Sequence, residues 1–427
     1  MSSLYPNWLR RVPFMGNAPV LTERQWRVLG IVALATMFGQ YALVLLPLAL
    51  PQIQVSLAIS AAQMSKLSAL IRLGALPAFM VALAADRFGR RRLFLAAVTG
   101  FALLTGATAF APTIAVFATL QCLTRTFVTA TSLLAGVIIV EEFPEEARGW
   151  GIGALSALTS IGGGVAAVLF AVVNLAPFGW RALYLIGLLA LLVSTFFQQN
   201  LPETMRFQAQ QRQEQQVAPY QRTVQPLARL VSAYPGRFLA LSAIIFLVSL
   251  GSETALFYDL AYLQQAHGWQ PWQISGLNVS AGFMAILGSA YAGQWSDRWG
   301  RKPVTVWFLA GLVIAIIGYF RGSAWLLPLL WAAMLFTSVG AGVALGTLRA
   351  ELFPTAYRST ATGVMAVLAT LGGAMSLALH SQLVNHHYSP WSALSLLALL
   401  MLGAPLLLPL LPETSQRRLE EIAPENG

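Results

Sequence analysis

Long apolar runs separated by short polar loops dominate the pattern of this chain. An α-helix needs about 20 mainly apolar residues to cross a bilayer core about 30 Å thick. Runs of this kind lie near residues 28–50, 64–85, 93–111, 114–140, 151–175 and 181–201, and again near 238–263, 275–296, 303–320, 325–348, 360–384 and 391–411. The pattern predicts an all-α integral membrane protein with twelve transmembrane helices.

One long polar segment divides these runs into two sets of six. The predicted organisation is a cytoplasmic N-terminal segment (1–27), a six-helix half (28–201), a cytoplasmic linker (202–236), a second six-helix half (237–411) and a cytoplasmic tail (412–427). The linker is rich in glutamine, which also occurs in binding tails. We favour a connecting role because the segment lies between two sets of equal size. The first apolar run is longer than the core of a signal peptide, so we expect it to be retained.

Composition supports a membrane environment. Hydrophobic residues make up 57% of the 427 residues and charged residues only 10%, whereas soluble proteins carry about a quarter charged residues. The net charge of +10 would suggest nucleic acid in a soluble protein, but here Lys and Arg cluster in loops between apolar runs. We therefore expect the lipid bilayer, and no nucleic acid, as a partner. A single cysteine, Cys122, excludes an intrachain disulfide and suggests no metal cluster.

Positive charge falls unevenly on alternate loops. If both termini are cytoplasmic, the predicted outer loops receive only Lys66, Arg181 and Arg321, and all other Lys and Arg outside the membrane core lie on the inner side. Cytoplasmic loops carry this excess in membrane proteins. The sequence therefore predicts a multi-pass protein of the cell membrane with both termini in the cytoplasm.

The two halves repeat one another at a fixed offset. Glu141, Pro144 and Arg148 recur 210 positions later as Glu351, Pro354 and Arg358, and Pro202-Glu203-Thr204 recurs as Pro412-Glu413-Thr414. Asp86-Arg87-x-Gly89-Arg90-Arg91 recurs at an offset of 211 as Asp297-Arg298-x-Gly300-Arg301-Lys302. Because each repeat has an even number of helices, the repeats are parallel. Such repeats surround a substrate site near the middle of the membrane.

These motifs resemble the major facilitator superfamily. Its loop motif Gly-x-x-x-Asp-Arg-x-Gly-Arg-Arg matches Gly293 to Lys302 well, whereas Ala82 replaces the first glycine in the first half. The Glu-x-x-Pro-x-x-x-Arg motif and the Pro-Glu-Thr ends are similar to the sugar-porter and metabolite–proton symporter branches. The resemblance covers nearly the whole chain. It implies the major facilitator fold, transport by alternating access, a small-molecule substrate and no cofactor.

The repeated charges are candidates for a cytoplasmic gating motif. Arg90 and Arg148 can bridge to carboxylates at neighbouring helix ends, and Asp86 can face the positive end of a helix dipole. Such pairs would latch the halves together in one state and release them in the other. The alternative is that the arginines only set topology. The candidate residues are Asp86, Arg87, Gly89, Arg90, Glu141, Arg148, Asp297, Arg298, Gly300, Arg301, Glu351 and Arg358.

Ionisable residues inside the membrane are costly and so indicate function. Arg72 lies about 21 Å from the inner end of its helix and Glu253 about 24 Å from the inner end of its own, at 1.5 Å per residue. Arg125 lies near mid-membrane. We hypothesise that an arginine holds a substrate carboxylate while Glu253 binds the coupling proton. The alternative is a purely structural pair of Arg125 with Glu253. Further candidates are Asp259 and His380, which outer water could also solvate, and the polar side chains Gln40, Tyr41 and Tyr258.

The predicted function is secondary transport of a small organic solute, with proton-coupled symport of an organic anion as the leading hypothesis. Efflux of an amphipathic compound and sugar uptake are alternatives, as is a non-transporting receptor. The stretch Ser160 to Val165 lacks the proline typical of drug antiporters, and Ser249 to Thr254 lacks the glutamines typical of sugar porters. No catalytic triad, metal-ligand or phosphate-loop pattern occurs, so we expect neither an enzyme nor a bound metal. We expect a monomer.

Overall fold

A computed structural model describes residues 19–192 and 231–415, and within these ranges every regular element is a helix. Packing divides the chain into two compact units. The first unit comprises residues 1–49 and 74–215, and the second comprises residues 50–73 and 216–427. Each unit is described separately below.

The first unit contains six described helices. They are α1 (Glu23–Leu48), α4 (Pro77–Phe88), α5 (Arg90–Thr108), α6 (Ile114–Glu142), α7 (Glu145–Phe170) and α8 (Trp180–Ile186). α1 packs against α6 and α7, and α6 also packs against α4 and α5. Thr22 begins α1 with a reciprocal capping box, and the Thr113 hydroxyl caps α6. Side chains such as Val32, Phe94 and Ile139 fill the core between these helices.

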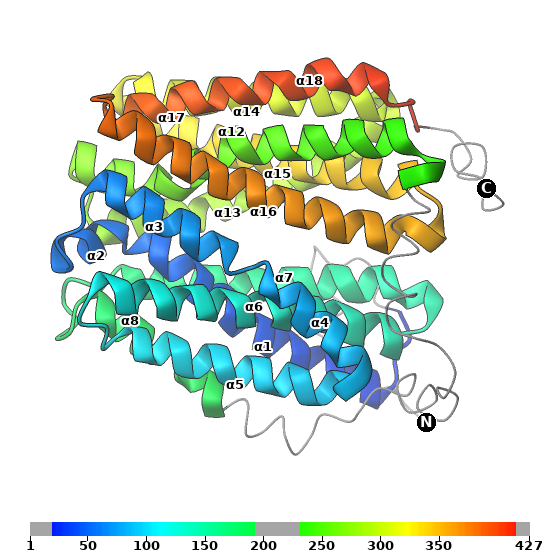
Figure 1. Cartoon of the computed structure of the whole chain (residues 1–427), viewed down its shortest axis with the longest axis horizontal. Coiled ribbons are helices and arrows are strands. Elements are labelled where there is room, and N and C mark those ends of the chain that lie inside the picture. Colours follow the sequence, from blue (N-terminus) through cyan, green and yellow to red (C-terminus); the bar gives the residue numbers. More distant parts are fainter. Residues whose placement is uncertain (1–18, 193–230, 416–427) are drawn as a thin grey trace. The chain divides into compact units, whose positions relative to one another are not determined.

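The second unit contains nine described α-helices. They are α2 (Leu50–Ser56), α3 (Ala61–Leu73), α12 (Pro235–His267), α13 (Pro271–Trp299), α14 (Arg301–Arg321), α15 (Leu327–Leu352), α16 (Thr355–Asn385), α17 (Pro390–Leu399) and α18 (Gly403–Leu407). Single 3₁₀ turns at 324–326, 400–402 and 408–410 extend α15, α17 and α18. α3 runs alongside α16, which packs on its other side against α12 (Figure 1).

Equivalent glycines bring helices together in both units. A Cβ on Gly162 would overlap the carbonyl oxygen of Met37, so α7 crosses α1 closely. A Cβ on Gly372 would lie 2.7 Å from the carbonyl oxygen of Phe246, so α16 crosses α12 in the same way. Small residues permit such approach between membrane helices. These two glycines are 210 positions apart, so the sequence repeat is also a repeat of packing.

The second predicted span, 64–85, is broken rather than continuous. α3 ends at Leu73, residues 74–76 form a turn, and α4 starts at Pro77. Pro77 has no N–H for the carbonyl four residues earlier. The Thr126 hydroxyl of α6 donates to the Gly74 carbonyl at 2.5 Å, which satisfies a backbone group that the break frees. The division between the two packing units falls at this break.

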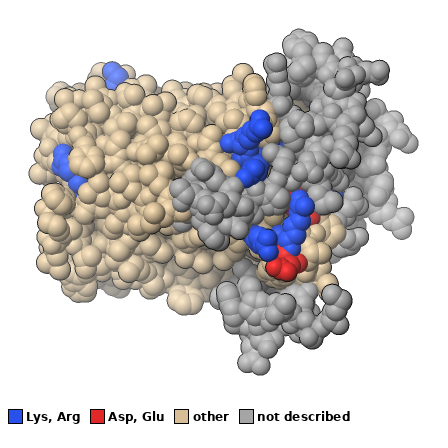
Figure 2. Space-filling model, turned by 90° about the horizontal axis from the view of Figure 1, so that it is seen from below, with Lys and Arg blue, Asp and Glu red and all other residues tan. Residues whose placement is uncertain are grey.

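Ten described helical segments, one of them the broken span Ala61–Val81, are long and apolar enough to cross a membrane. α5 starts with three arginines, which shortens its apolar part, and the predicted span 181–201 runs past residue 192 into residues outside the described ranges. Together these segments fit the twelve predicted helices. Many large apolar side chains are exposed, including Phe283 and Ile314. Figure 2 shows a face on which uncharged residues cover a broad area, with larger groups of Lys and Arg on one side, some beside Asp and Glu, and smaller basic patches on the other.

Candidate functional site

Arg72 and Glu253 form an ion pair inside the second unit. Arg72 lies in the last turn of α3, and its Nη1 donates to the Glu253 carboxylate of α12. Their side chains are 15% and 28% exposed. A charge in the membrane core is costly unless it is paired, so each side chain stabilises the other.

The guanidinium of Arg72 has a hydrogen-bond donor that the ion pair with Glu253 does not use. Its Nε is buried, and no acceptor for it exists among the described residues. Gly373 of α16 lies against this edge, because a Cβ there would overlap Nε and Cζ of Arg72. The sequence did not single out Gly373 as a site residue. The available signal was the pair Gly372-Gly373, in which one glycine faces α12 and the other faces the arginine.

A second buried cluster joins the same three helices. The Ser65 hydroxyl of α3 lies 2.6 Å from the Tyr258 hydroxyl of α12 and 2.7 Å from Nδ1 of His380 of α16. Nε2 of His380 lies 2.9 Å from the carbonyl oxygen of Pro390. His380 is 0% exposed. The structure thus brings two predicted site residues, Tyr258 and His380, into one network with a residue that the sequence did not single out.

Asp259 faces a different set of helices. Its carboxylate accepts from the Trp331 indole N–H of α15 at 2.9 Å and from the Leu260 amide at 2.6 Å. The Tyr319 hydroxyl of α14 donates to the Asp259 carbonyl at 2.8 Å. The side chain is buried. Its carboxylate is therefore solvated by these neutral donors and not by water at the outer end of the membrane, which was the alternative raised by the sequence. The observed contacts tie α12 to α14 and α15.

Three candidates lie in the first unit. Arg125 is half-buried in α6, next to Thr126, whose hydroxyl bonds the Gly74 carbonyl. Glu253, the partner that the alternative hypothesis gave to Arg125, pairs with Arg72. The Tyr41 hydroxyl donates to the Leu183 carbonyl at 2.7 Å, and its ring lines an apolar cavity of about 370 Å³ between α1, α7 and the start of the next span. Gln40 packs beside Gly163. These contacts give Tyr41 a packing role.

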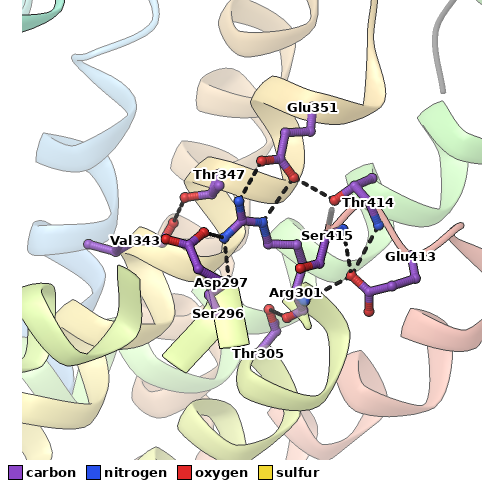
Figure 3. A network of polar contacts seen from close by, with 10 residues as sticks. All are labelled: Ser296, Asp297, Arg301, Thr305, Val343, Thr347, Glu351, Glu413, Thr414 and Ser415. Carbon is purple, nitrogen blue, oxygen red and sulfur yellow. Dashed lines mark hydrogen bonds and ion pairs between the residues drawn. The ribbon is translucent and has the colours of Figure 1, made fainter. Parts of the chain in front are cut away.

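The loop motif of the second unit forms a dense charge network around Arg301 (Figure 3). Arg301 donates through Nε and Nη2 to Glu351 at 3.1 and 2.8 Å. Its Nη1 donates to Asp297 at 2.6 Å and to Ser296 at 3.1 Å. Bidentate pairing of this kind fixes orientation as well as charge. The network joins the ends of α13, α14 and α15.

Glu413 closes this network from the C-terminal side. Its carboxylate accepts from the first two amides of α14, those of Arg301 and Lys302, at 2.8 and 3.1 Å. It also accepts from the amides of Thr414 and Ser415, and the Thr414 hydroxyl donates to Glu351 at 2.5 Å. Burial raises the pKa of the Glu413 carboxyl, but these backbone hydrogen bonds outweigh it and the net pKa is lowered. The second copy of the Pro-Glu-Thr motif therefore caps α14, and the first copy lies outside the described residues.

Corresponding charges pair in the first unit. Arg90 bonds Glu141 at 2.8 Å, and Arg24 bonds Glu142 through two contacts of 3.0 Å. Nε of Arg148 donates to the Val140 carbonyl at 3.0 Å. Each described network lies within one unit, so a latch between the halves stays a prediction.

The remaining motif residues differ in what the structure describes. The side chains of Asp86, Arg87 and Arg358 lie outside the described residues, and Arg298 is exposed. Gly89 and Gly300 both have φ of 99°, a backbone conformation that favours glycine. Each lies at the turn between two consecutive helices, which explains the glycine of the repeated loop motif.

Replacing Glu413 by Gln is expected to destabilise the protein by about 1 to 3 kcal/mol, since charge-assisted hydrogen bonds to two helix amides are weakened. A carboxyl whose pKa is lowered on folding adds stability above its unfolded value and loses it as pH falls through the folded value. The difference in Tm between wild type and variant should therefore shrink below about pH 4.5. Glu23→Gln, at an exposed side chain, is the control; an equal Tm loss there would contradict the assignment.

Comparison with known proteins agrees with this architecture. The family model described as Major Facilitator Superfamily matches residues 29–377 and 241–425. A niacin transporter of Acinetobacter baylyi is 26% identical over 79% of this chain and 82% of its own length. A gallate transporter of Pseudomonas putida is 26% identical over 84% of this chain and 85% of its own length. These relatives are transporters, which agrees with the predicted absence of enzymatic activity.

Solved structures show the same fold. The crystal structure of a D-xylose–proton symporter superposes with a TM-score of 0.75 at 14% identity, covering 92% of this chain and 99% of the other. At this identity the likeness concerns the fold alone. The all-helical architecture predicted from the apolar runs is confirmed.

Proposed function

The chain belongs to the Major Facilitator Superfamily and is a multi-pass membrane transporter, and we propose that it moves a small aromatic carboxylate by symport with protons. The observation that carries the proposal is the partly exposed Arg72–Glu253 pair. An arginine is the side chain best suited to hold a carboxylate by two parallel hydrogen bonds. Two relatives of this protein are named for niacin and gallate, which are both aromatic carboxylic acids.

The pair offers a simple way to couple two solutes. While Glu253 is ionised it occupies Arg72 and competes with an anionic substrate. A proton on Glu253 removes this competition and leaves the arginine charge for the substrate carboxylate. Loss of the proton restores the ion pair and expels the anion. Binding of proton and anion is then mutually favourable, which is the reciprocity that symport requires.

We place the protein in the cell membrane as a monomer, with both termini cytoplasmic. The support is the excess of Lys and Arg on one set of loops, following the positive-inside rule. In this orientation the networks of Arg90 and Arg301 lie at the cytoplasmic end. The Ser65–His380 cluster lies toward the outer end.

The proposed function is tested with purified protein in liposomes. Nicotinate and benzoate are compared with nicotinamide and benzamide, which keep the ring but lack the charge. We expect a carboxylate to accumulate above its level in protein-free liposomes only under an inward proton gradient, and a protonophore to abolish this protein-dependent accumulation. The amides should not accumulate.

Other outcomes would point elsewhere. Equal uptake of acid and amide would remove the carboxylate from the proposal. Carboxylate uptake that ignores the proton gradient would remove the coupling. Extrusion of amphipathic dyes, or accumulation of sugars, would support the alternatives raised by the sequence.

A further inference from the structure

The cluster of Ser65, Tyr258 and His380 has a defined proton arrangement. A backbone carbonyl only accepts hydrogen bonds, so Nε2 of His380, 2.9 Å from the Pro390 carbonyl, carries a hydrogen. In a neutral imidazole Nδ1 must then be the acceptor. Ser65 consequently donates to Nδ1 at 2.7 Å and accepts from Tyr258 at 2.6 Å. In this series of hydrogen bonds, from the Tyr258 hydroxyl to the Pro390 carbonyl, every polar atom therefore has a partner when His380 is neutral.

One added proton can be placed on Nδ1 without breaking this geometry. Nδ1–H would donate to Ser65, whose hydroxyl would turn to the Ala61 carbonyl, 3.0 Å away. Tyr258 would continue to donate to Ser65. The cost of protonation is therefore not a lost hydrogen bond but a buried charge, because His380 is 0% exposed.

No described group nearby compensates that charge. From α12, Tyr258 faces the imidazole, with ring centroids 5.1 Å apart. The nearest carboxylates along α12 are engaged elsewhere: Glu253 pairs with Arg72, and Asp259 accepts from Trp331. On α3, Lys66 is exposed, and α17 contains no titratable side chain. Burying a charge without a counter-ion is strongly unfavourable.

This cluster is one of several contacts that hold α3 against α12 and α16. Ser381 of α16 donates to the Ala62 carbonyl at 2.8 Å, and Arg72 pairs with Glu253 at the other end of α3. Before α3, Gln52 and Gln54 of α2 pair with Gln264 and Gln265 at 2.9 and 2.7 Å. His380 is thus a titratable group buried beneath α3, and α3 ends at the break that begins at Gly74.

We propose that His380 is a proton-binding site whose occupancy is linked to the docking of α3: the docked helix requires neutral imidazole, and a proton on His380 favours release of α3. Released α3 would let water reach the imidazolium. Linkage of one proton to this equilibrium changes it by at most about tenfold per pH unit. The site is distinct from the Arg72–Glu253 pair and does not depend on the identity of the solute.

Release of α3 can be followed by labelling in the full-length protein in liposomes without solute. In a Cys122→Ser background, Ala62→Cys places a thiol on the docked face of α3, because Ala62 is buried. Gln63→Cys, at the exposed neighbouring position, is the matched control. The rate of labelling by an impermeant maleimide is measured in each variant. Dividing the rate for Ala62→Cys by the rate for Gln63→Cys cancels the pH dependence of the thiol chemistry.

We expect this ratio of labelling rates to stay flat from about pH 8 to about pH 6.5, the ordinary pKa of a solvated imidazole, and to rise by up to about tenfold per unit as external pH falls below it. His380→Gln, which stays neutral, should give a flat low ratio. Tyr258→Phe retains the imidazole and should retain the pH dependence. Glu253→Gln leaves Arg72 of α3 unpaired, so it should raise the ratio at every pH while the ratio still rises as pH falls.

Two results would overturn the proposal: a pH-independent ratio in the parent, or an unchanged pH dependence in His380→Gln. If only Glu253→Gln removed the dependence, the proton site would be Glu253 and not His380. Because no solute is present, failure here is distinguishable from failure of the transport assay.

Discussion

The double variant Arg72→Gln/Glu253→Gln is expected to fold and to lose gradient-driven accumulation of the carboxylate by about 100-fold. Each neutral amide removes a charge-assisted interaction worth about 1.5 to 3 kcal/mol, and the proposed symport needs one group for the anion and one for the proton. Folding should survive, because replacing both members of a largely buried pair leaves no isolated charge. Uptake into liposomes and Tm in detergent provide the two measurements.

The double variant separates function from structure. If the pair only held α3 to α12, removing both charges would restore most of what a single substitution loses, and uptake would recover. The single variants, each leaving one unpaired charge, should be less stable than the double variant by about 3 kcal/mol or more. Glu23→Gln/Arg27→Gln removes an exposed pair of the same kind and serves as control. Normal uptake by the double variant would refute the proposed site.

Gly373→Ala is expected to reduce carboxylate uptake at least tenfold, about 1.4 kcal/mol in binding, although it adds only one methyl group. That methyl would overlap the guanidinium of Arg72 and force it away from Glu253. Gly363→Ala is the matched control on the same helix, since a Cβ there meets no atom within 4 Å. It should change uptake less than twofold. Similar losses at both glycines would indicate a general effect on α16.

The cause of the Gly373 effect can be isolated with a second substitution. Arg72→Lys keeps the charge on a slimmer, non-planar head group. If the added methyl acts only through the guanidinium, Gly373→Ala should cost little further activity in the Arg72→Lys background. Full additivity of the two losses would mean that the sites act independently.

The fold followed from the sequence because the bilayer constrains it. Runs of about 20 apolar residues and charged loops are demanded by the solvent, so the predicted spans match α1, α6, α12 and α16 within a few residues. The break in the second span was missed even though Pro77 is visible in the chain. An apolar run reports on burial in lipid but not on helix continuity.

The candidate site was predicted in part. Position along a helix gives depth, and the similar depths of Arg72 and Glu253, about 21 and 24 Å, were a signal for their pairing. What the sequence lacks is the direction in which each side chain points around its helix axis. Apolar residues lie on nearly all sides of α12 and α16, and α3 has polar residues on its buried face as well as on its exposed face, so no amphipathic stripe marks the side that faces the site. For this reason Ser65 and Gly373 were not recognised, although both lie against predicted site residues.

The break at residues 74–76 has a consequence for dividing the protein. The repeat suggests cutting the chain within 202–236 to express two halves, as a gene-duplication history would imply. Such a cut would separate α2 and α3 from the bundle on which they pack. The N-terminal fragment would carry an arginine without its carboxylate, and the C-terminal fragment would expose Glu253, Tyr258 and His380. The two fragments should therefore be interdependent for assembly, because the N-terminal fragment carries two helices that belong to the second packing unit.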